Sequence, residues 1–376
     1  MSEYSVFLPS YSVGDECYRQ IPYVTRKYGR TAVVIGGKTA MSKAKPEILK
    51  ALAGSDVEIL DFLWYGGDSN LENVEMLKRS EAVRRADMVF GVGGGRACDT
   101  AKMVGDMLDK PFFTFPTLAS NCASSTAIAV VYHQDGSFRE YYYMKTPAYH
   151  TFINTGIIAD SPEKLLWAGI GDALSKECEA LFASREKPLY HTPLMGRCMA
   201  KICTEPLLSY GRQALEDCRS RRSSFELEQV ALDIIISTGI VSNFMTHEDQ
   251  PDPADNYYYN SSLAHCVYYG ASGIPACEKA HLHGEIVAFG VLCLLTYDHQ
   301  LQERDRILAF NRSVGLPVTL AELNLTPEDV SKIVKKASTV VEWRYIPGAP
   351  TEERFRQAIL ETDRVGREAK NKEVKG

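Results

Sequence analysis

The sequence predicts an α/β domain built on a parallel sheet, followed by a mostly helical domain. Three observations support this fold class. Up to about residue 150, short apolar or β-branched runs alternate with helical patterns, as in sheets covered by helices on both faces. A glycine-rich turn separates a strand pattern from a helix pattern within Gly91–Lys102. After Ser161, long stretches show the 3.6-residue periodicity of amphipathic helices.

The first domain should contain four strands that alternate with helices. The expected strands are residues 31–35, 57–60, 87–91 and 112–115. The expected helices are residues 43–53, 71–86 and 101–108. Asp135-Gly136 is a turn signal of β-hairpins, so residues 121–132 and 138–144 should pair beside the sheet.

The second domain starts at a clear helix signal. Ser161, Pro162 and Glu163 supply a cap, a proline at the first helical position and an acid in the first turn. Helices are expected at residues 161–185, 225–245, 284–299, 301–314, 326–337 and 352–369. A loop is expected at residues 250–253 and a frayed end at 370–376. The predicted domains are residues 1–157, which bind a dinucleotide, and 158–376, a helical metal-binding and substrate domain.

Charge and composition exclude several classes of function. The formal net charge is −6, which argues against binding to nucleic acid or to a membrane surface. No apolar run reaches the roughly 18 residues that span a bilayer. The ten cysteines form no Cys-x-x-Cys pair, which is typical of free thiols in a reducing cytoplasm. We therefore expect a cytoplasmic protein that acts on a small molecule.

The glycine-rich turn has the chemistry of a phosphate site. A strand, a glycine turn and a helix bring backbone N–H groups and a helix N-terminus against a pyrophosphate. Gly93, Gly94 and Gly95 carry no Cβ that would hold a phosphate away. The spacing differs from the common G-x-G-x-x-G, and a turn without a ligand is the alternative. Because ligands bind at the carboxyl ends of parallel strands, three turns should converge there. They contain Gly37 and Lys38, then Gly93 to Arg96, then Thr117, Leu118 and Ser120.

The turn after the first predicted strand bears on the choice between NAD and NADP. An acid at this turn would bind the ribose 2′-OH and repel a 2′-phosphate. The sequence has Gly36, Gly37 and Lys38 instead, with no acid. A lysine pairs with a phosphate, which favours NADPH or the use of both cofactors. The alternative is a surface lysine on a flexible turn.

Three residues of the second half have the composition of a metal site. Two histidines and a carboxylate with an open position, here His265, His283 and Asp172, are a common catalytic set for Zn²⁺ or Fe²⁺. The histidines are 18 positions apart, or about 27 Å on one straight helix. They meet only if the chain breaks between them, and residues 270–275 contain two glycines and a proline. The alternative is a pair of core or capping histidines and a helix aspartate. His281 is either a neighbour of the metal site or substrate, or an exposed loop histidine.

Taken together, these motifs resemble the iron-containing (group III) alcohol dehydrogenase superfamily, and within it the glycerol dehydrogenase-like branch. The resemblance runs from about residue 30 to 300 and rests on residues 91–102, 116–120, 168–174 and 283–290. It implies the dehydroquinate synthase-like architecture, with the active site in the cleft between the two domains, and a homo-oligomer.

The resemblance also assigns residues. It carries the catalytic metal ligands onto Asp172, His265 and His283, with zinc more usual than iron in this branch. It carries the NAD(P) contacts onto Gly93, Gly94, Gly95, Thr117, Ser120, Thr126, Ile128 and Tyr132.

One departure from the branch concerns the substrate. Glycerol dehydrogenases have an aspartate two positions after the serine of this motif, where it helps to hold the polyol. The sequence has Cys122 at that position, and a thiol is a poor acceptor for a diol. A similar Ser-x-Cys-Ala arrangement occurs in members that resemble hydroxycarboxylate dehydrogenases, which reduce 2-oxo acids. Cys122 and His281 are the expected substrate contacts.

We therefore expect a metal-dependent NAD(P)-linked oxidoreductase that interconverts a small alcohol or 2-hydroxy acid and its carbonyl compound. The metal would act as a Lewis acid during hydride transfer. Glycerol itself is disfavoured, and a polyol dehydrogenase of the glycerol type is the first alternative. The others are a dehydroquinate synthase-like lyase, which uses NAD transiently, and a catalytically inactive nucleotide-binding protein.

Overall fold

The computed structural model describes residues 5–248 and 256–373, and the chain divides into two compact units. The first unit consists of residues 1–166 and 213–243, and the second of residues 167–212 and 244–376. This division differs from the expected single boundary at 157/158. Residues 213–243 group with the α/β part because Asn243 hydrogen-bonds Ser125 and Ala127.

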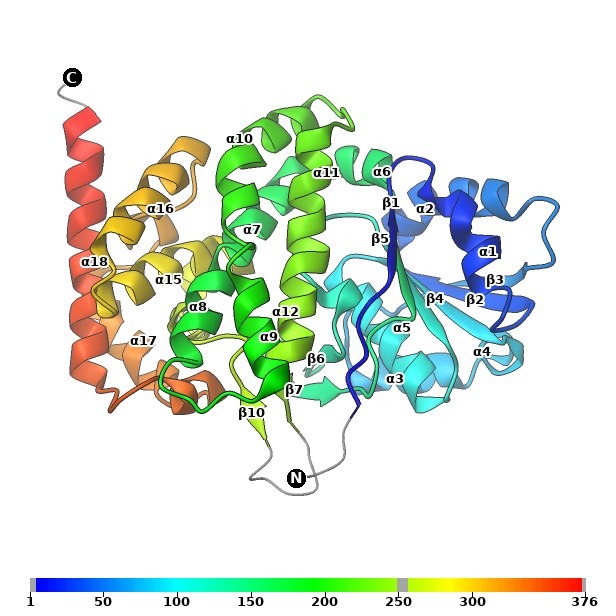
Figure 1. Cartoon of the computed structure of the whole chain (residues 1–376), viewed down its shortest axis with the longest axis horizontal. Helices are drawn as coiled ribbons and strands as arrows, with labels where there is room; N and C mark the ends of the chain where they lie inside the picture. Colours follow the sequence, from blue (N-terminus) through cyan, green and yellow to red (C-terminus); the bar gives the residue numbers. More distant parts are fainter. Residues whose placement is uncertain (1–4, 249–255, 374–376) are drawn as a thin grey trace. The chain divides into compact units, whose positions relative to one another are not determined.

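A parallel six-stranded sheet forms the centre of the first unit, in the order β1-β8-β5-β4-β2-β3 (Figure 1). The strands are β1 (Tyr11–Val13), β2 (Thr31–Gly36), β3 (Glu58–Trp64), β4 (Met88–Gly93), β5 (Phe112–Pro116) and β8 (His150–Ile153). The four expected strands are all present. The sequence analysis missed β1 and β8 because they have only three and four residues, too few to show a period.

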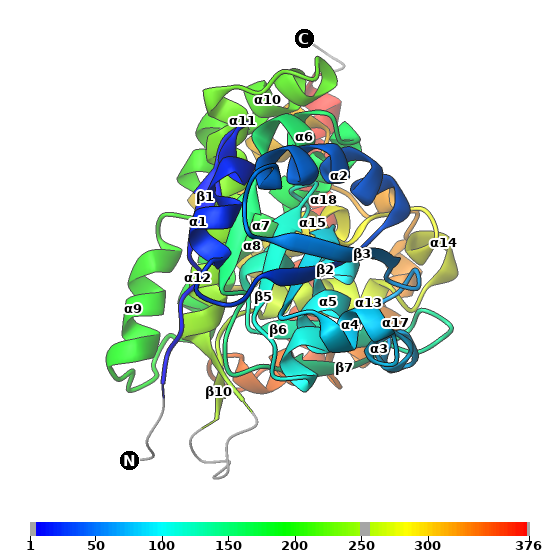
Figure 2. The same ribbon diagram turned by 90° about the vertical axis from the view of Figure 1, so that its right-hand side faces the viewer.

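Both faces of the sheet are covered, as a parallel sheet requires. Alternate residues of β2 point to opposite faces: Ala32 and Val34 join one apolar cluster, and Val33 and Ile35 the other. Figure 2 shows α1 and α2 on one side of β2 and β3, and α3, α4 and α5 on the other. The helices of this layer are η1 (Cys17–Gln20), α1 (Ile21–Thr25), α2 (Lys38–Leu52), α3 (Leu71–Lys78), α4 (Glu81–Arg85), α5 (Gly95–Met107) and α6 (Thr155–Ala159).

Two expected helices are interrupted. The helix expected at 71–86 forms α3 and α4, because Ser80 adopts an extended conformation between them. The helix expected at 225–245 contains a π-helical turn, a feature that often marks a functional site. It consists of α11 (Phe225–Leu232), the π-helical turn (Asp233–Ser237) and α12 (Thr238–Met245).

The expected β-hairpin is confirmed. It consists of β6 (Ile128–Tyr132) and β7 (Phe138–Tyr143), which pair antiparallel. The N–H of His133 donates to the carbonyl of Ser137 at 2.8 Å, and Gly136 has the positive φ of +84° that this tight turn needs. Ala129 and Val131 of β6 pack in the cluster beneath α3 and α5. The hairpin is therefore attached to the sheet layer by its inner face.

The second unit is built from helices around a buried central one. α15 (His283–Tyr297) is buried along nearly all of its length, and it contacts α8, α13, α16 and α18. The other helices of this half are α7 (Glu163–Ala173), α8 (Ser175–Ala183), α9 (His191–Ala200), α10 (Glu205–Arg219), α13 (Leu263–Ala271), α14 (Pro275–Glu278), α16 (Leu301–Val314), α17 (Val330–Ala337) and α18 (Glu352–Glu373). Short 3₁₀ turns lie at Ala321–Leu323 (η5), Pro327–Asp329 (η6) and Val341–Tyr345 (η7), and another, η2 (Ala123–Ser125), lies in the first unit. The two-residue strands are β9 (Thr246–His247) and β10 (Tyr257–Tyr258).

Several expectations for this half need correction. Helices α9, α10 and α13 were not anticipated, and α18 continues to Glu373 where a frayed end was expected from residue 370. The loop expected at 250–253 lies outside the described residues. Within the described part of the chain, no helix combines the length and the apolar character that a membrane span needs.

Candidate functional site

The glycine turn joins β4 to α5 as the sequence predicts. Gly93 ends β4 with φ +146°, Gly94 caps α5, and the helix begins at Gly95. A Cβ on Gly93 would lie 2.8 Å from the Cβ of Ala97, so a larger residue there would push the helix away from the strand. The N-terminus of a 13-residue helix thus opens directly from the strand end, which is a favourable place for an anion.

The three expected turns lie side by side at the carboxyl edge of the sheet. The N–H of Gly37 donates to the carbonyl of Val92 at 3.2 Å, and that of Thr117 to the carbonyl of Gly93 at 3.2 Å. Leu118 lies next to the glycine turn, 3.3 Å from the position that a Cβ on Gly94 would take. Ligands of open α/β sheets bind at this edge.

Lys38 is the first residue of α2 and is exposed. Its ammonium lies 4.6 Å from the centre of the ring of Trp64, the last residue of β3. A cation over an aromatic face is held by the ring quadrupole. The lysine is therefore oriented at the sheet edge, next to the turn that contains Gly37.

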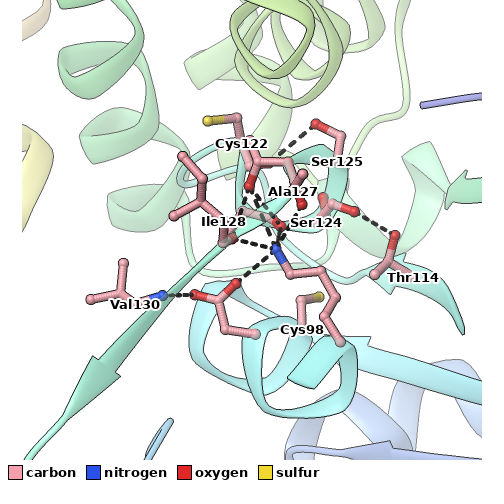
Figure 3. Close-up of polar contacts among 12 residues, drawn as sticks. Cys98, Thr114, Cys122, Ser124, Ser125, Ala127, Ile128 and Val130 are labelled. Atoms are coloured by element: carbon pink, nitrogen blue, oxygen red, sulfur yellow. Dashed lines mark hydrogen bonds and ion pairs between the residues drawn. The ribbon is translucent and has the colours of Figure 1, made fainter. Parts of the chain in front are cut away.

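The segment that carries the other expected cofactor contacts is fastened to α5 by a buried lysine. Lys102 has no exposed surface. Its ammonium donates to the carbonyls of Ala123 at 2.5 Å, Thr126 at 3.0 Å and Ile128 at 2.7 Å. In Figure 3, the labelled residues Ser124, Ala127 and Ile128 lie around the dashed lines that mark these contacts. Two of the three carbonyls belong to predicted cofactor residues.

Asp99 completes this network from the same helix. Its Oδ1 forms an ion pair with Lys102 at 2.9 Å, and its Oδ2 accepts the N–H of Val130 at 3.1 Å. Burial raises the pKa of Asp99 and the lysine opposes that rise. Arg96 of α5 lies over the ring of Tyr132, the last residue of β6, and its guanidinium carbon is 4.5 Å from the ring centre. The helix that begins at the glycine turn therefore positions the whole of β6.

The same segment is held on its other side by the α11–α12 region. Asn243 donates to the carbonyl of Ser125 at 3.0 Å and accepts the N–H of Ala127 at 2.8 Å. The hydroxyl of Ser125 donates to the carbonyl of Ile235 in the π-helical turn. Cys122 precedes η2, is partly buried, and directs its sulfur away from this network (Figure 3).

The three expected metal ligands come together in the second unit. Asp172 lies near the end of α7, His265 in α13, and His283 starts α15. Nε2 of His283 is 3.0 Å and Nε2 of His265 is 3.7 Å from Oδ1 of Asp172. One ligand atom from each residue lies within 4.8 Å of the other two. This spacing suits three donors around one ion.

Missing side chains let the three helices approach closely. A Cβ on Gly284 would lie 1.8 Å from the carbonyl oxygen of Ala168, so α15 starts against the backbone of α7. A Cβ on Gly290 would lie 2.4 Å from the carbonyl oxygen of Ala264, one residue before His265. The expected chain break is also present: α13 ends at Ala271 and α15 begins at His283.

A buried carboxylate orients His265. Glu179 of α8 has no exposed surface. Its Oε1 accepts the backbone N–H groups of Ser262 at 2.7 Å and His265 at 3.0 Å, and its Oε2 lies 2.7 Å from Nδ1 of His265. Burial alone would raise the pKa of Glu179, but His265 and these N–H groups hold it below its usual value. Such a partner fixes the ring and leaves Nε2 for a metal.

The electrostatics of Asp172 also suit a ligand. Burial alone would raise its pKa, but His283, His265 and Lys176 hold that pKa below the usual value. The carboxylate is therefore ionised, as metal binding requires. One oxygen and two imidazole nitrogens are donors that both Zn²⁺ and Fe²⁺ accept, with a position left open. The residues fit a divalent metal.

His281 lies beside this group without belonging to it. Its Nδ1 is 2.7 Å from Oε1 of Glu285, in the first turn of α15. Its Nε2 is buried and has no hydrogen-bond partner within the described parts of the chain. Its role as a substrate contact, like that of Cys122 in the first unit, stays a prediction.

Sequence analysis missed three polar residues of these sites, Lys102, Lys176 and Glu179. Their signal is helical spacing. Lys176 and Glu179 lie four and seven positions after Asp172, and such positions share one helix face. Lys102 follows Asp99 by three positions on a helix that is otherwise buried among apolar side chains.

Comparisons with known proteins agree with this geometry. The family model described as iron-containing alcohol dehydrogenase matches residues 9–152. A glycerol dehydrogenase of Escherichia coli is 30% identical over 350 residues, which are 89% of this chain and 89% of that protein. The chain belongs to the iron-containing alcohol dehydrogenase superfamily, in its glycerol dehydrogenase-like branch.

Two other members of the superfamily are informative. Hydroxycarboxylate dehydrogenase A of Escherichia coli is 28% identical over 340 residues, 88% of this chain and 89% of that protein. The crystal structure of glycerol dehydrogenase from Schizosaccharomyces pombe superposes with a TM-score of 0.86 at 22% identity, covering 99% of this chain and 93% of that one. The likeness extends over both units, so the expected two-part fold class is confirmed.

Proposed function

We propose that this protein is a metal-dependent, NAD(P)-linked oxidoreductase that interconverts a small alcohol or 2-hydroxy acid and its carbonyl compound. The observation that carries this proposal is the approach of Asp172, His265 and His283 within 4.8 Å. These residues would hold one divalent metal, zinc more readily than iron. When bound, such an ion acts as a Lewis acid toward the substrate oxygen.

The first unit would bind the cofactor. The N-terminus of α5 at Gly94 and Gly95 receives the pyrophosphate, while Lys102 and Asp99 hold the segment with Thr126 and Ile128 in place. In the reductive direction, bound NAD(P)H would supply the hydride for the carbonyl carbon and leave as NAD(P)⁺. The C=O π electrons would form the new O–H bond with a proton from solvent.

NADPH is the preferred cofactor in this proposal. The turn after β2 contains no acid that would repel a 2′-phosphate. Lys38 lies at this turn, held over Trp64, and offers the positive charge that a 2′-phosphate needs. Turnover with NADPH and NADH at equal concentrations measures this preference.

A polyol dehydrogenase is the second candidate, and a named relative favours it. The Escherichia coli protein with 30% identity is a glycerol dehydrogenase, whereas the one with 28% identity is a hydroxycarboxylate dehydrogenase. Cys122 replaces the aspartate expected for polyol binding, so we place 2-oxo acids first. Reduction of dihydroxyacetone in preference to 2-oxo acids would favour a polyol dehydrogenase.

The variant His283→Ala tests the metal assignment. We expect turnover of NADPH with every carbonyl substrate to fall below detection, because the metal loses one of three ligands. Binding of NADPH, measured by nucleotide fluorescence, should stay within about twofold. His191→Ala, an exposed histidine at the start of α9, is the matched control. Unchanged turnover in His283→Ala would refute the metal site.

A further inference from the structure

A lysine lies one helical turn beyond the metal ligand Asp172. α7 ends at Ala173 and α8 begins at Ser175, and Leu174 between them has helical dihedral angles of −55° and −25°. The helical path therefore continues, and Lys176 lies on the same face as Asp172. This lysine also acts electrostatically on both Asp172 and His265, so its charge is felt at the metal centre.

The ammonium of Lys176 is buried and forms no ion pair with any described residue. The residue is 6% exposed. Its Nζ donates to the carbonyl of Asn260 at 3.2 Å and to the side-chain oxygen of the same residue. Within residues 5–248 and 256–373, no carboxylate lies within ion-pair distance of this nitrogen. An ammonium has three N–H donors, so one remains for a ligand, and a buried cation is costly until it is paired.

The charge balance of the site favours an anionic ligand. Asp172 and Glu179 bring two negative charges, a divalent metal would bring two positive charges, and Lys176 adds a third positive charge. Two further acids lie near these residues: burial raises the pKa of Glu342 toward the neutral form, and Glu285 contacts Nδ1 of His281. The metal-loaded centre would thus carry a net positive charge in a largely buried environment.

We propose that Lys176 is a specificity-determining residue that binds the carboxylate of a 2-oxo or 2-hydroxy acid beside the metal centre. This inference rests on the proposed function and narrows its substrate class from alcohols in general to acids. The carboxylate accepts the unused N–H of Lys176 and undergoes no bond change. Bound NAD(P)H would supply the hydride for the adjacent carbonyl carbon, whose oxygen would gain a solvent proton.

A pair of substrates that differ in one group tests this role. Pyruvate and hydroxyacetone share a methyl ketone, and the carboxylate of the first is a hydroxymethyl group in the second. In Lys176→Met and Lys176→Gln, we expect kcat/KM for pyruvate to fall about 10-fold or more, as for a lost charge-assisted hydrogen bond. The loss should appear mainly in KM. Activity with hydroxyacetone should stay within about threefold, and the inhibition constant of oxamate should rise in parallel.

Controls separate this role from a structural one. Lys187→Met removes an exposed lysine beyond the end of α8. This variant should leave kcat/KM unchanged for both substrates. Metal content and melting temperature are measured for every variant. An equal loss with both substrates, or an unchanged ratio between them, would overturn the inference.

The wild-type protein separates the two levels of the proposal. Reduction of hydroxyacetone without reduction of pyruvate would overturn the assignment of Lys176 and leave the proposed oxidoreductase function standing. 2-Oxobutyrate and 1-hydroxy-2-butanone provide a longer matched pair. If the protein reduces no member of either pair, the role of Lys176 and the proposed oxidoreductase function are both contradicted.

Discussion

Among single residues, Glu179 contacts a ligand of the proposed metal centre without being a ligand itself. Its two oxygens accept the backbone N–H groups of Ser262 and His265 and contact Nδ1 of His265. The carboxylate thus fixes the start of α13 and the tautomer of the histidine at the same time. A carboxylate partner of this kind also makes the imidazole a better donor.

Glu179→Gln should weaken metal binding by about 10- to 100-fold, the usual effect of losing such a partner. The amide keeps the size of the side chain but removes its charge, and one of its two polar atoms is a donor. Competition with a chromogenic zinc chelator measures the affinity. Glu278→Gln, at an exposed position of α14, is the control. Equal affinities of the two variants would show that Glu179 does not orient His265.

The sequence predicted the residues with distinctive chemistry better than their partners. Asp172, His265 and His283 could be named because few residue types bind metals and the glycine and proline break was visible. Lys102 and Glu179 were missed because their partners are mostly backbone groups, which no sequence pattern displays. Lys176 was missed because its proposed role depends on its having no ion-pair partner among the residues that the structure describes.

At the scale of elements, the proposed metal centre depends on how closely α7, α13 and α15 approach one another. Gly284 lets α15 begin against the carbonyl of Ala168, and Gly290 lets it pass the carbonyl of Ala264. Helices whose axes lie this close need positions without a side chain. The glycines of the sequence motifs therefore act through helix packing as well as through turns.

Gly284→Ala should disrupt this packing and metal binding together. The added methyl group would lie 1.8 Å from the carbonyl oxygen of Ala168, which forces the helices apart, and overpacking of this kind costs about 1–3 kcal/mol. Thermal unfolding and metal content provide the two measurements. Gly273→Ala is the control, since its nearest neighbour would be 3.7 Å away. If Gly284→Ala binds metal as the wild type does, close helix contact is not what assembles the site.

Several strands and helices were predicted well, whereas most missed or misjudged elements are short or interrupted; the 15-residue helix α10 is an exception. β2, β4 and β5 were located within one or two residues, and α16 at its observed bounds. α13 was missed although it carries His265, because it has only nine residues and they are apolar on most sides. The π-helical turn was also missed, since nothing in residues 233–237 distinguishes it from an ordinary helix.

At the scale of the whole molecule, the two units contain different parts of the proposed chemistry. All proposed cofactor contacts lie in the first unit, and all proposed metal ligands lie in the second. The metal would join three helices that are far apart in the sequence. Its binding energy should therefore stabilise the second unit, because an unfolded chain does not present the three donors together.

Removal of the metal should lower the melting temperature of the protein. At 100 times its dissociation constant, a ligand adds about 2.7 kcal/mol, and each 1 kcal/mol shifts the midpoint of a unit of this size by about 2–4 °C. Scanning fluorimetry of zinc-loaded protein, before and after EDTA, should show a decrease of about 5–10 °C. NADPH should still raise the midpoint of the metal-free protein. A midpoint that does not respond to zinc would contradict a structural contribution of the site.

The burial of Lys102 has a practical consequence for immobilisation of the protein. Coupling to an activated support through amines modifies lysines that solvent reaches, and Lys102 has no exposed surface. Its ammonium, shared among three carbonyls and Asp99, is protected from acylation as long as the first unit stays folded. Surface attachment through other lysines therefore leaves the internal support of the cofactor segment chemically intact.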